Sequence, residues 1–290
     1  LETGKLDMAF CAEMEGLQMK SYRVELVETG SGAGNAGSAG QPLDRPFEFG
    51  NEFYTVRIEK NGIISSFRNS EGKELVDSER PYFNDLLMQA DNGDLWTYNE
   101  SPHNGGYFGR PVKEYPYLDK SNEFLNECYA HFFLSNSHSE LVEDGPVRCV
   151  IMVKGTLKFW RISCDFTQHI YLYKHSPRID FKLKMHCQGR NYRVRACFPT
   201  SIRNGRIEHE IPFGFYERRE EEYAAMNWIS YRDEEKGLLL LNRGLPGNSV
   251  HNGVMMLSLM RSANMDYKAV SDLAFEQGEE FTFEYSIVPY

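Results

Sequence analysis

The 290-residue sequence has no apolar run long enough to cross a bilayer, and no signal-peptide pattern follows Leu1. It also has fewer positive than negative residues: 32 Lys and Arg against 42 Asp and Glu, which gives a formal net charge of −10. Nucleic acids and anionic membranes attract cationic surfaces, so we expect neither as a partner. Because the first residue is not Met, we expect the chain to be a piece of a longer protein.

Cysteine is scarce, and none of the six cysteines forms a C-x-x-C pair. Four of them lie in strand-like segments beside apolar neighbours: Cys149, Cys164, Cys187 and Cys197. This dispersion favours buried free thiols over a disulfide framework in a chain of this size. Free thiols persist in a reducing compartment, so we expect a cytoplasmic location.

Local motifs for catalysis are missing as well. No two histidines have the H-x-x-x-H or H-E-x-x-H spacing of a zinc site, and no serine lies in a G-x-S-x-G elbow. The acidic runs at 220–222 and 233–235 are typical of solvated turns, not of two carboxylates opposed across a sugar. The sequence therefore predicts no catalytic residue and no metal ligand in this chain.

Sustained helical periodicity is absent, and only residues 78–89 could hold a short helix, which Pro81 disfavours. Strand signals are frequent instead: polar–apolar alternation at 53–59 leads into the hairpin turn Asn61-Gly62. Alternation of the same kind recurs at 178–186, 192–198 and 281–288. It is typical of antiparallel strands with one solvated face. These features predict an all-β antiparallel sandwich.

A low-complexity run of Gly, Ala and Ser at 28–42 interrupts the strand signals. Its G-x-G lacks the strand–glycine–helix context of a nucleotide site. We therefore expect a small β element over 1–27, a flexible connection over 28–46 and a large β-sandwich domain over 47–290.

Two segments carry residues suited to binding a sugar. In DNGDLWTYNESP (91–102), Asp94, Trp96 and Tyr98 combine rings for the C–H face of a pyranose with a carboxylate for its hydroxyls. The alternative is that both rings belong to the core of a strand. In LLLLNRGLPGNSV (238–250), the leucines predict a strand buried on both faces, from whose end Asn242 and Arg243 could reach a ligand. The alternative there is a solvated turn.

Further segments, in this order along the chain, resemble the C-terminal half of glycoside hydrolase family 38, the retaining, zinc-dependent α-mannosidases. They read NEFYTVRIEKNGIISSFRNSEGKELV, HSPRIDFKLKM, EIPFGFYERR, NWISYRDEEKGLLLLNRGLPGNSVHNGVMMLSLMRS and FTFEYSIVPY. KSYRVE near the start is similar to the small β element that precedes the large sandwich in that family. The resemblance covers most of residues 20–290.

The resemblance implies a β-supersandwich of the galactose-mutarotase-like kind that follows a catalytic barrel and a helical bundle. In the family, the barrel supplies the catalytic carboxylates and the zinc ligands, so the chain is expected to be a non-catalytic scaffold of a bacterial enzyme. It would share the α-mannoside or oligosaccharide substrate with that barrel through two loops. The implied substrate-binding residues are Asp94, Trp96, Tyr98, Asn242 and Arg243. Residues 93–100 and 242–247 are then expected to border the same cleft.

Two other functions stay open at this point. A free-standing carbohydrate-binding module would need an exposed aromatic platform and affinity for sugar in the isolated chain. A mutarotase-like epimerase would need a His acid and a carboxylate base in one cleft, and no spacing favours such a pair. Likeness of fold alone does not establish either activity. A homo-oligomer is an open alternative.

Overall fold

The computed structural model describes residues 40–91, 128–131, 137–159, 162–189, 192–263 and 280–290, with Phe10, Ala12, Met19, Ser21 and Tyr22 as single residues. Within these ranges all regular structure is β-strand, and no helix there is long and apolar enough to span a membrane. Residues 78–89, where Pro81 disfavours a short helix, form no helix. The chain enters a strand there instead, after Asn84, whose φ of 63° lies outside the right-handed helical region.

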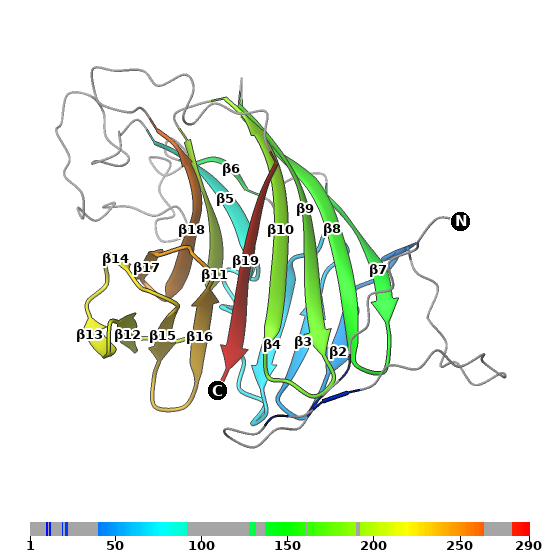
Figure 1. Ribbon diagram of the computed structural model, residues 1–290, viewed down its shortest axis with the longest axis horizontal. Helices are drawn as coiled ribbons and strands as arrows, with labels where there is room; N and C mark the ends of the chain where they lie inside the picture. The colour runs from blue at the N-terminus through cyan, green and yellow to red at the C-terminus, as the bar shows by residue number, and fades with distance from the viewer. Residues whose placement is uncertain are drawn as a thin grey trace.

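The described strands form three antiparallel sheets (Figure 1). In spatial order, the ten-stranded sheet holds β1 (Gln41–Pro42), β7 (His138–Asp144), β8 (Arg148–Phe159), β9 (Ile162–Tyr173), β10 (Ile179–Gln188), β19 (Glu280–Pro289), β16 (Gly237–Asn242), β15 (Trp228–Arg232), β12 (Arg206–Ile211) and β13 (Gly214–Arg218). The six-stranded sheet holds β14 (Glu222–Ala224), β17 (Gly247–His251), β18 (Val254–Ser262), β11 (Tyr192–Pro199), β5 (Asp85–Ala90) and β6 (Cys128–His131). The three-stranded sheet holds β2 (Phe47–Gly50), β3 (Tyr54–Ile58) and β4 (Ile64–Asn69). The predicted all-β antiparallel sandwich is confirmed.

Alternation predicts the strands well where one face is solvated. In β10 the apolar positions are buried and the polar positions between them are only partly covered. Two predictions of burial are wrong. β11 is buried at every position, although its alternation predicts one solvated face. β16 shows the opposite difference, because its four leucines predict burial on both faces. Leu238 and Leu240 face the core, but Leu239 and Leu241 are only partly buried.

Aromatic side chains connect all three sheets through one core. The ring centroids of Tyr54 and Phe67 lie 5.4 Å apart in the three-stranded sheet, and Phe67 lies 6.0 Å from Phe83. Phe83 lies 5.2 Å from Phe198 on β11, which lies 6.2 Å from Tyr285 on β19 in the ten-stranded sheet. Each buried ring of this size stabilises the fold by about 2–3 kcal/mol through removal of apolar surface from water. The three sheets therefore share a single hydrophobic core.

A ring of three hydrogen bonds lies inside this core. The Asn84 amide donates to Gln168 Oε1 (2.9 Å), Gln168 Nε2 donates to the Tyr285 hydroxyl (2.8 Å), and that hydroxyl donates to Asn84 Oδ1 (2.9 Å). All three side chains are buried. Gln168 and Tyr285 belong to the ten-stranded sheet and Asn84 leads into β5, so the ring fixes the two large sheets against each other.

The predicted Asn61-Gly62 hairpin turn between β3 and β4 is confirmed. Gly62 has a φ of +89°, and its N–H donates to the Glu59 carbonyl (2.8 Å). The turn also packs closely on β8: a Cβ placed on Gly62 would lie 2.6 Å from both Cγ atoms of Val153. Glycine is therefore required here by backbone conformation and by packing.

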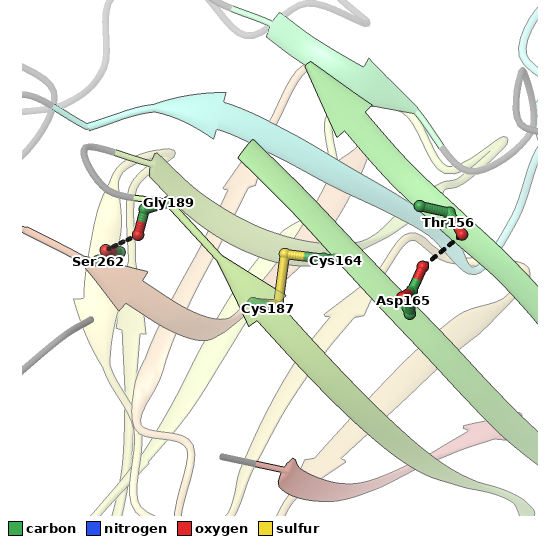
Figure 2. Close-up of a disulfide and its surroundings, with 6 residues drawn as sticks. All are labelled: Thr156, Cys164, Asp165, Cys187, Gly189 and Ser262. Atoms are coloured by element: carbon green, nitrogen blue, oxygen red, sulfur yellow. Dashed lines mark hydrogen bonds between the residues drawn. A yellow bond between two sulfur atoms is a disulfide. The ribbon is translucent and has the colours of Figure 1, made fainter. Parts of the chain in front are cut away.

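The expectation of free thiols is wrong for two cysteines. Cys164 on β9 and Cys187 on β10 are directly opposite each other in the antiparallel register, and they form a disulfide (Figure 2). Cys149 does not form a disulfide and is buried. Burial, with a hydrogen bond to Asp144, raises the pKa of its thiol to about 11, so it is a weak nucleophile at neutral pH.

The division of the chain into 1–27, 28–46 and 47–290 stays a prediction. Most of residues 1–39 lie outside the described ranges. At the end of the Gly/Ala/Ser run, Gln41 and Pro42 form the short strand β1, which pairs with β7 at the edge of the ten-stranded sheet.

Candidate functional site

The turn after the four leucines carries the chain from one sheet to another. β16 ends at Asn242 in the ten-stranded sheet, and β17 begins at Gly247 in the six-stranded sheet. Gly244 turns the chain with a φ of +73°. The Pro246 carbonyl accepts hydrogen bonds from Asn248 Nδ2 (2.8 Å) and from the Ala225 N–H (2.9 Å). The polar, glycine-containing sequence therefore has a structural role in addition to any binding role.

Beside this turn lies a groove of about 390 Å³ that crosses β9, β10, β19 and β16. Among the residues that line it are Tyr171, Tyr173, Asp180, Leu241, Arg243 and Ser286. β16 is not buried on both faces because Leu241 forms part of the groove wall. A cavity of this volume, with a few polar groups and tyrosine rings, suits a small polar ligand.

Asp180 organises one side of the groove. Its carboxylate accepts hydrogen bonds from the hydroxyls of Tyr173 (2.8 Å) and Ser286 (2.6 Å) and from Arg178 Nη2 (3.0 Å). Burial, with the hydrogen bond to Asp180, raises the pKa of Tyr173 to about 12, so its hydroxyl stays protonated and donating. These three donors fix the carboxylate, and the polar wall is formed before any ligand arrives.

Positive charge predominates in the groove, although the whole chain is acidic. Its lining includes the cations of Arg148, Arg178, Lys182 and Arg243 against the carboxylates of Asp180 and Glu284. Arg243 forms an ion pair with Glu284 and remains 81% exposed. Arg148 lies over the Tyr171 ring, 5.2 Å from its centroid. These groups offer hydrogen-bond donors for the oxygen atoms of a polyol or an anion.

The structure separates the two residues predicted after the leucines. Arg243 is exposed beside the groove. Asn242 also borders the groove but is 7% exposed, and it follows the alternation of Leu238 and Leu240, whose side chains face the core. Neither amide atom of Asn242 has a hydrogen-bond partner among the described residues. Sugar binding by either residue stays a prediction.

Replacing Asn242 with Leu is expected to raise the free energy of unfolding by about 1 kcal/mol, because burial of an unpaired amide is unfavourable and Leu has a similar volume. Chemical denaturation of the chain measures this change. Asn248→Leu is the matched control, since its amide nitrogen holds the Pro246 carbonyl, and it should destabilise the chain. A loss of stability in Asn242→Leu would mean that the amide has a partner, such as a bound water.

The other predicted residues, Asp94, Trp96 and Tyr98, lie outside the described residues. The segment that holds them follows β5 in the six-stranded sheet. At the end of β5, the Asp91 carboxylate accepts hydrogen bonds from Arg261 Nε (2.6 Å) and Nη2 (3.0 Å). Whether this segment approaches the Arg243 turn stays a prediction.

Sequence reasoning missed a cluster of buried charges on the six-stranded sheet. Arg193 lies 3.1 Å from Glu222, and Arg195 donates to the Ser249 hydroxyl (2.6 Å). Burial alone would raise the pKa of Glu222, but Arg193 and Arg195 hold that pKa below its usual value. The signal is present in YRVRACF, where arginines occupy the second face of an otherwise apolar strand.

Among the described residues, no group of three or more His, Cys, Asp or Glu side chains could hold a metal ion. The zinc that the resemblance implies therefore has no ligand set in this part of the chain.

Comparison with protein families gives a match over most of the chain. The family described as the glycosyl hydrolases family 38 C-terminal domain matches residues 49–268. Over 252 residues, the chain is 25% identical to Alpha-mannosidase G of Dictyostelium discoideum, a match that covers 83% of this chain and 21% of that protein.

Solved structures give the same fold. A glycosyl hydrolase family 38 protein from Enterococcus faecalis superimposes with a TM-score of 0.66 at 17% identity, over 87% of this chain and 31% of that chain. An alpha-mannosidase from Enterococcus faecalis V583 gives a TM-score of 0.65 at 18% identity, over 88% and 30%. The chain thus spans between a fifth and a third of the length of these relatives.

Proposed function

The chain belongs to the glycosyl hydrolases family 38 C-terminal domain family, and from this we propose that it is the non-catalytic β-sandwich of a retaining, zinc-dependent α-mannosidase. The family match over 49–268 carries the proposal. Two of the relatives that it resembles bear the name alpha-mannosidase. The whole enzyme's activity is part of the proposal, because the chain spans only a part of those relatives.

The proposal divides the work between two parts of the enzyme. A retaining glycosidase needs two carboxyl groups about 5–5.5 Å apart across one cleft, and a zinc-assisted one needs several ligands around the metal. We propose that a catalytic barrel outside this chain supplies both. Zinc, when bound there, would engage hydroxyls of the mannoside.

This chain would support the barrel and lend residues to the sugar cleft. The groove is the basis for that role: Arg243 offers an exposed guanidinium, and Asp180 is already held by three donors. Asp94, Trp96 and Tyr98 are proposed to add a ring and a carboxylate from the segment after β5, with Asn242 beside the turn. We also propose that the enzyme is bacterial and cytoplasmic and binds no nucleic acid or membrane. The cytoplasmic location is inferred from free thiols, and the Cys164–Cys187 disulfide removes two of them from that argument.

The test compares the complete parent protein with this chain alone. We expect the complete protein to hydrolyse an aryl α-mannoside and to hold stoichiometric zinc, and the isolated chain to do neither. Turnover that copurifies with the isolated chain through repeated chromatography would overturn the scaffold assignment. Faster exchange of sugar anomers in NMR spectra of the isolated chain, abolished by a single His substitution, would instead establish the epimerase alternative.

A further inference from the structure

Large apolar side chains lie at one edge of the ten-stranded sheet, and most of them are exposed. They belong to the hairpin of β12 and β13 and to the chain just before and at the start of β15: Phe213, Phe215, Tyr216, Met226 and Trp228. We call these five residues the hairpin surface. Phe213 at the turn is fully exposed, Phe215 and Tyr216 are 60% and 63% exposed, and Trp228 is partly buried. In Figure 1 the hairpin lies at the opposite side of the sheet from β7.

Phe213 is an unusual residue for its place in the turn. Its φ is +70°, in the left-handed region that disfavours side chains with a Cβ, and glycine follows it directly. A large apolar ring in this conformation, exposed to water, costs stability in the chain by itself. Nothing in the fold of the described residues requires phenylalanine here, which points to a contact made outside this chain.

The hairpin that carries these rings is firmly built. His209 of β12 is buried, and its ring packs edge-on against Tyr223 with centroids 5.6 Å apart. Burial lowers the pKa of His209 to about 4, with Arg218 adding to the effect, so the ring is neutral at neutral pH. The Glu210 carboxylate accepts a hydrogen bond from the Asn227 N–H (2.7 Å), and the Phe215 ring lies 6.2 Å from that of Trp228. The surface is therefore presented in a fixed arrangement.

Strand register connects the hairpin surface to the groove. Trp228 pairs with Leu241, Leu241 with Ser286, and Ser286 with Asp180 across four neighbouring strands. Residues paired in this way lie side by side on the same face of a sheet. Phe215 and Trp228 therefore share the outer face of the groove, whereas Tyr216, which pairs with the buried His209, lies on the other face of this edge.

We propose that the hairpin surface is the docking site for the catalytic part of the same hydrolase, with Phe213 as an anchor that enters that domain. The proposal rests on the proposed function. The relatives have more than two thirds of their length outside the matched region, so an enzyme of this kind has other parts large enough to cover an exposed surface of this domain. Aromatic residues and Met are enriched at the centres of protein interfaces.

A sugar platform fits the hairpin surface less well than a protein does. Rings that bind sugars are accompanied by polar groups that take the hydroxyls. Phe213 and Met226 have apolar side chains, and the neighbouring Glu210 carboxylate is already engaged by Asn227. The polar groups suited to a sugar lie instead in the groove.

Hydroxyl-radical footprinting of the complete parent protein tests the proposal. Phe213, Tyr216 and Met226 should be oxidised about tenfold more slowly there than in the 290-residue chain alone, the change expected when an interface closes over exposed side chains. Phe213→Gly removes the proposed anchor, so Met226 should again be oxidised rapidly in the complete protein. The hairpin should stay folded in this variant, because glycine suits a φ of +70°. Phe281→Ser, on a partly exposed ring of β19, is the matched control and should leave the protection intact.

The alternatives give different footprints, and each contradicts the proposal. Equal oxidation in the complete protein and in the isolated chain would mean that the surface faces solvent. Protection of the isolated chain that grows with its concentration would assign the surface to a second copy. Protection of the isolated chain by a mannose oligosaccharide would assign it to sugar. Because footprinting does not depend on turnover, the result stands whether or not the parent protein hydrolyses mannosides.

Discussion

Tyr285→Phe is expected to lower the free energy of unfolding by about 3 kcal/mol, although it removes one oxygen atom and preserves the ring. The hydroxyl accepts from Gln168 and donates to Asn84, so its loss leaves two buried polar groups without their partners. Each such group costs about 1–3 kcal/mol. Burial raises the pKa of Tyr285, and the hydroxyl therefore stays neutral as pH rises. Urea denaturation followed by tyrosine or tryptophan fluorescence measures the change.

Tyr231→Phe is the matched control for this prediction. Tyr231 is equally buried, but its hydroxyl makes a long 3.4 Å contact to the Ile202 carbonyl and otherwise meets the Gly205 backbone, with no side-chain partner among the described residues. The control should lose less than about 1 kcal/mol. Equal losses in the two variants would show that the ring of hydrogen bonds contributes nothing specific.

Gly62→Ala is expected to destabilise the chain by about 3–4 kcal/mol, through two independent effects. A φ of +89° costs alanine about 1–2 kcal/mol. The new methyl group would also overlap both Cγ atoms of Val153, and crowding of this kind costs about 1–3 kcal/mol. Thermal or chemical denaturation of the variant gives the sum of the two.

Two further variants separate these effects. Gly72 has a φ of +77°, and a Cβ placed on it would have no neighbouring atom within 4 Å, so Gly72→Ala should show the conformational cost alone. Val153→Ala in the Gly62→Ala background should recover part of the loss, because it removes the crowded methyl groups. If Gly62→Ala and Gly72→Ala cost the same, the contact with β8 is not tight.

The fold could be predicted from the sequence wherever the two faces of a strand differ in polarity. The alternation in β10 and the Asn61-Gly62 turn are local signals, and both are confirmed. Alternation fails in β11, because Arg193 and Arg195 are residues typical of a solvated face. Their buried environment depends on Glu222 and Ser249, which are 29 and 54 residues away. No local pattern contains that pairing.

The other wrong predictions have the same cause: they depend on contacts between residues that are distant in the sequence. Four consecutive leucines predict burial on both faces, but the groove beside β16 leaves Leu241 partly open. The Cys164–Cys187 disulfide depends on the register of β9 against β10, which spacing in the sequence does not reveal. The groove itself combines residues from 148 to 286, of which the sequence indicates only Asn242 and Arg243, because a turn signal follows them directly.

The central place of β19 has a consequence for biosynthesis. β10 and β16 do not pair with each other; both pair with β19, which is made last among the described strands. While residues up to 263 emerge from a ribosome, β7 to β10 can form only one part of the ten-stranded sheet, and β12, β13, β15 and β16 only the other part. Each part has an open edge where β19 later pairs. Such edges invite pairing with other chains. Completion of this domain therefore depends on residues 280–289, and a truncation that removed them would leave two separate half-sheets.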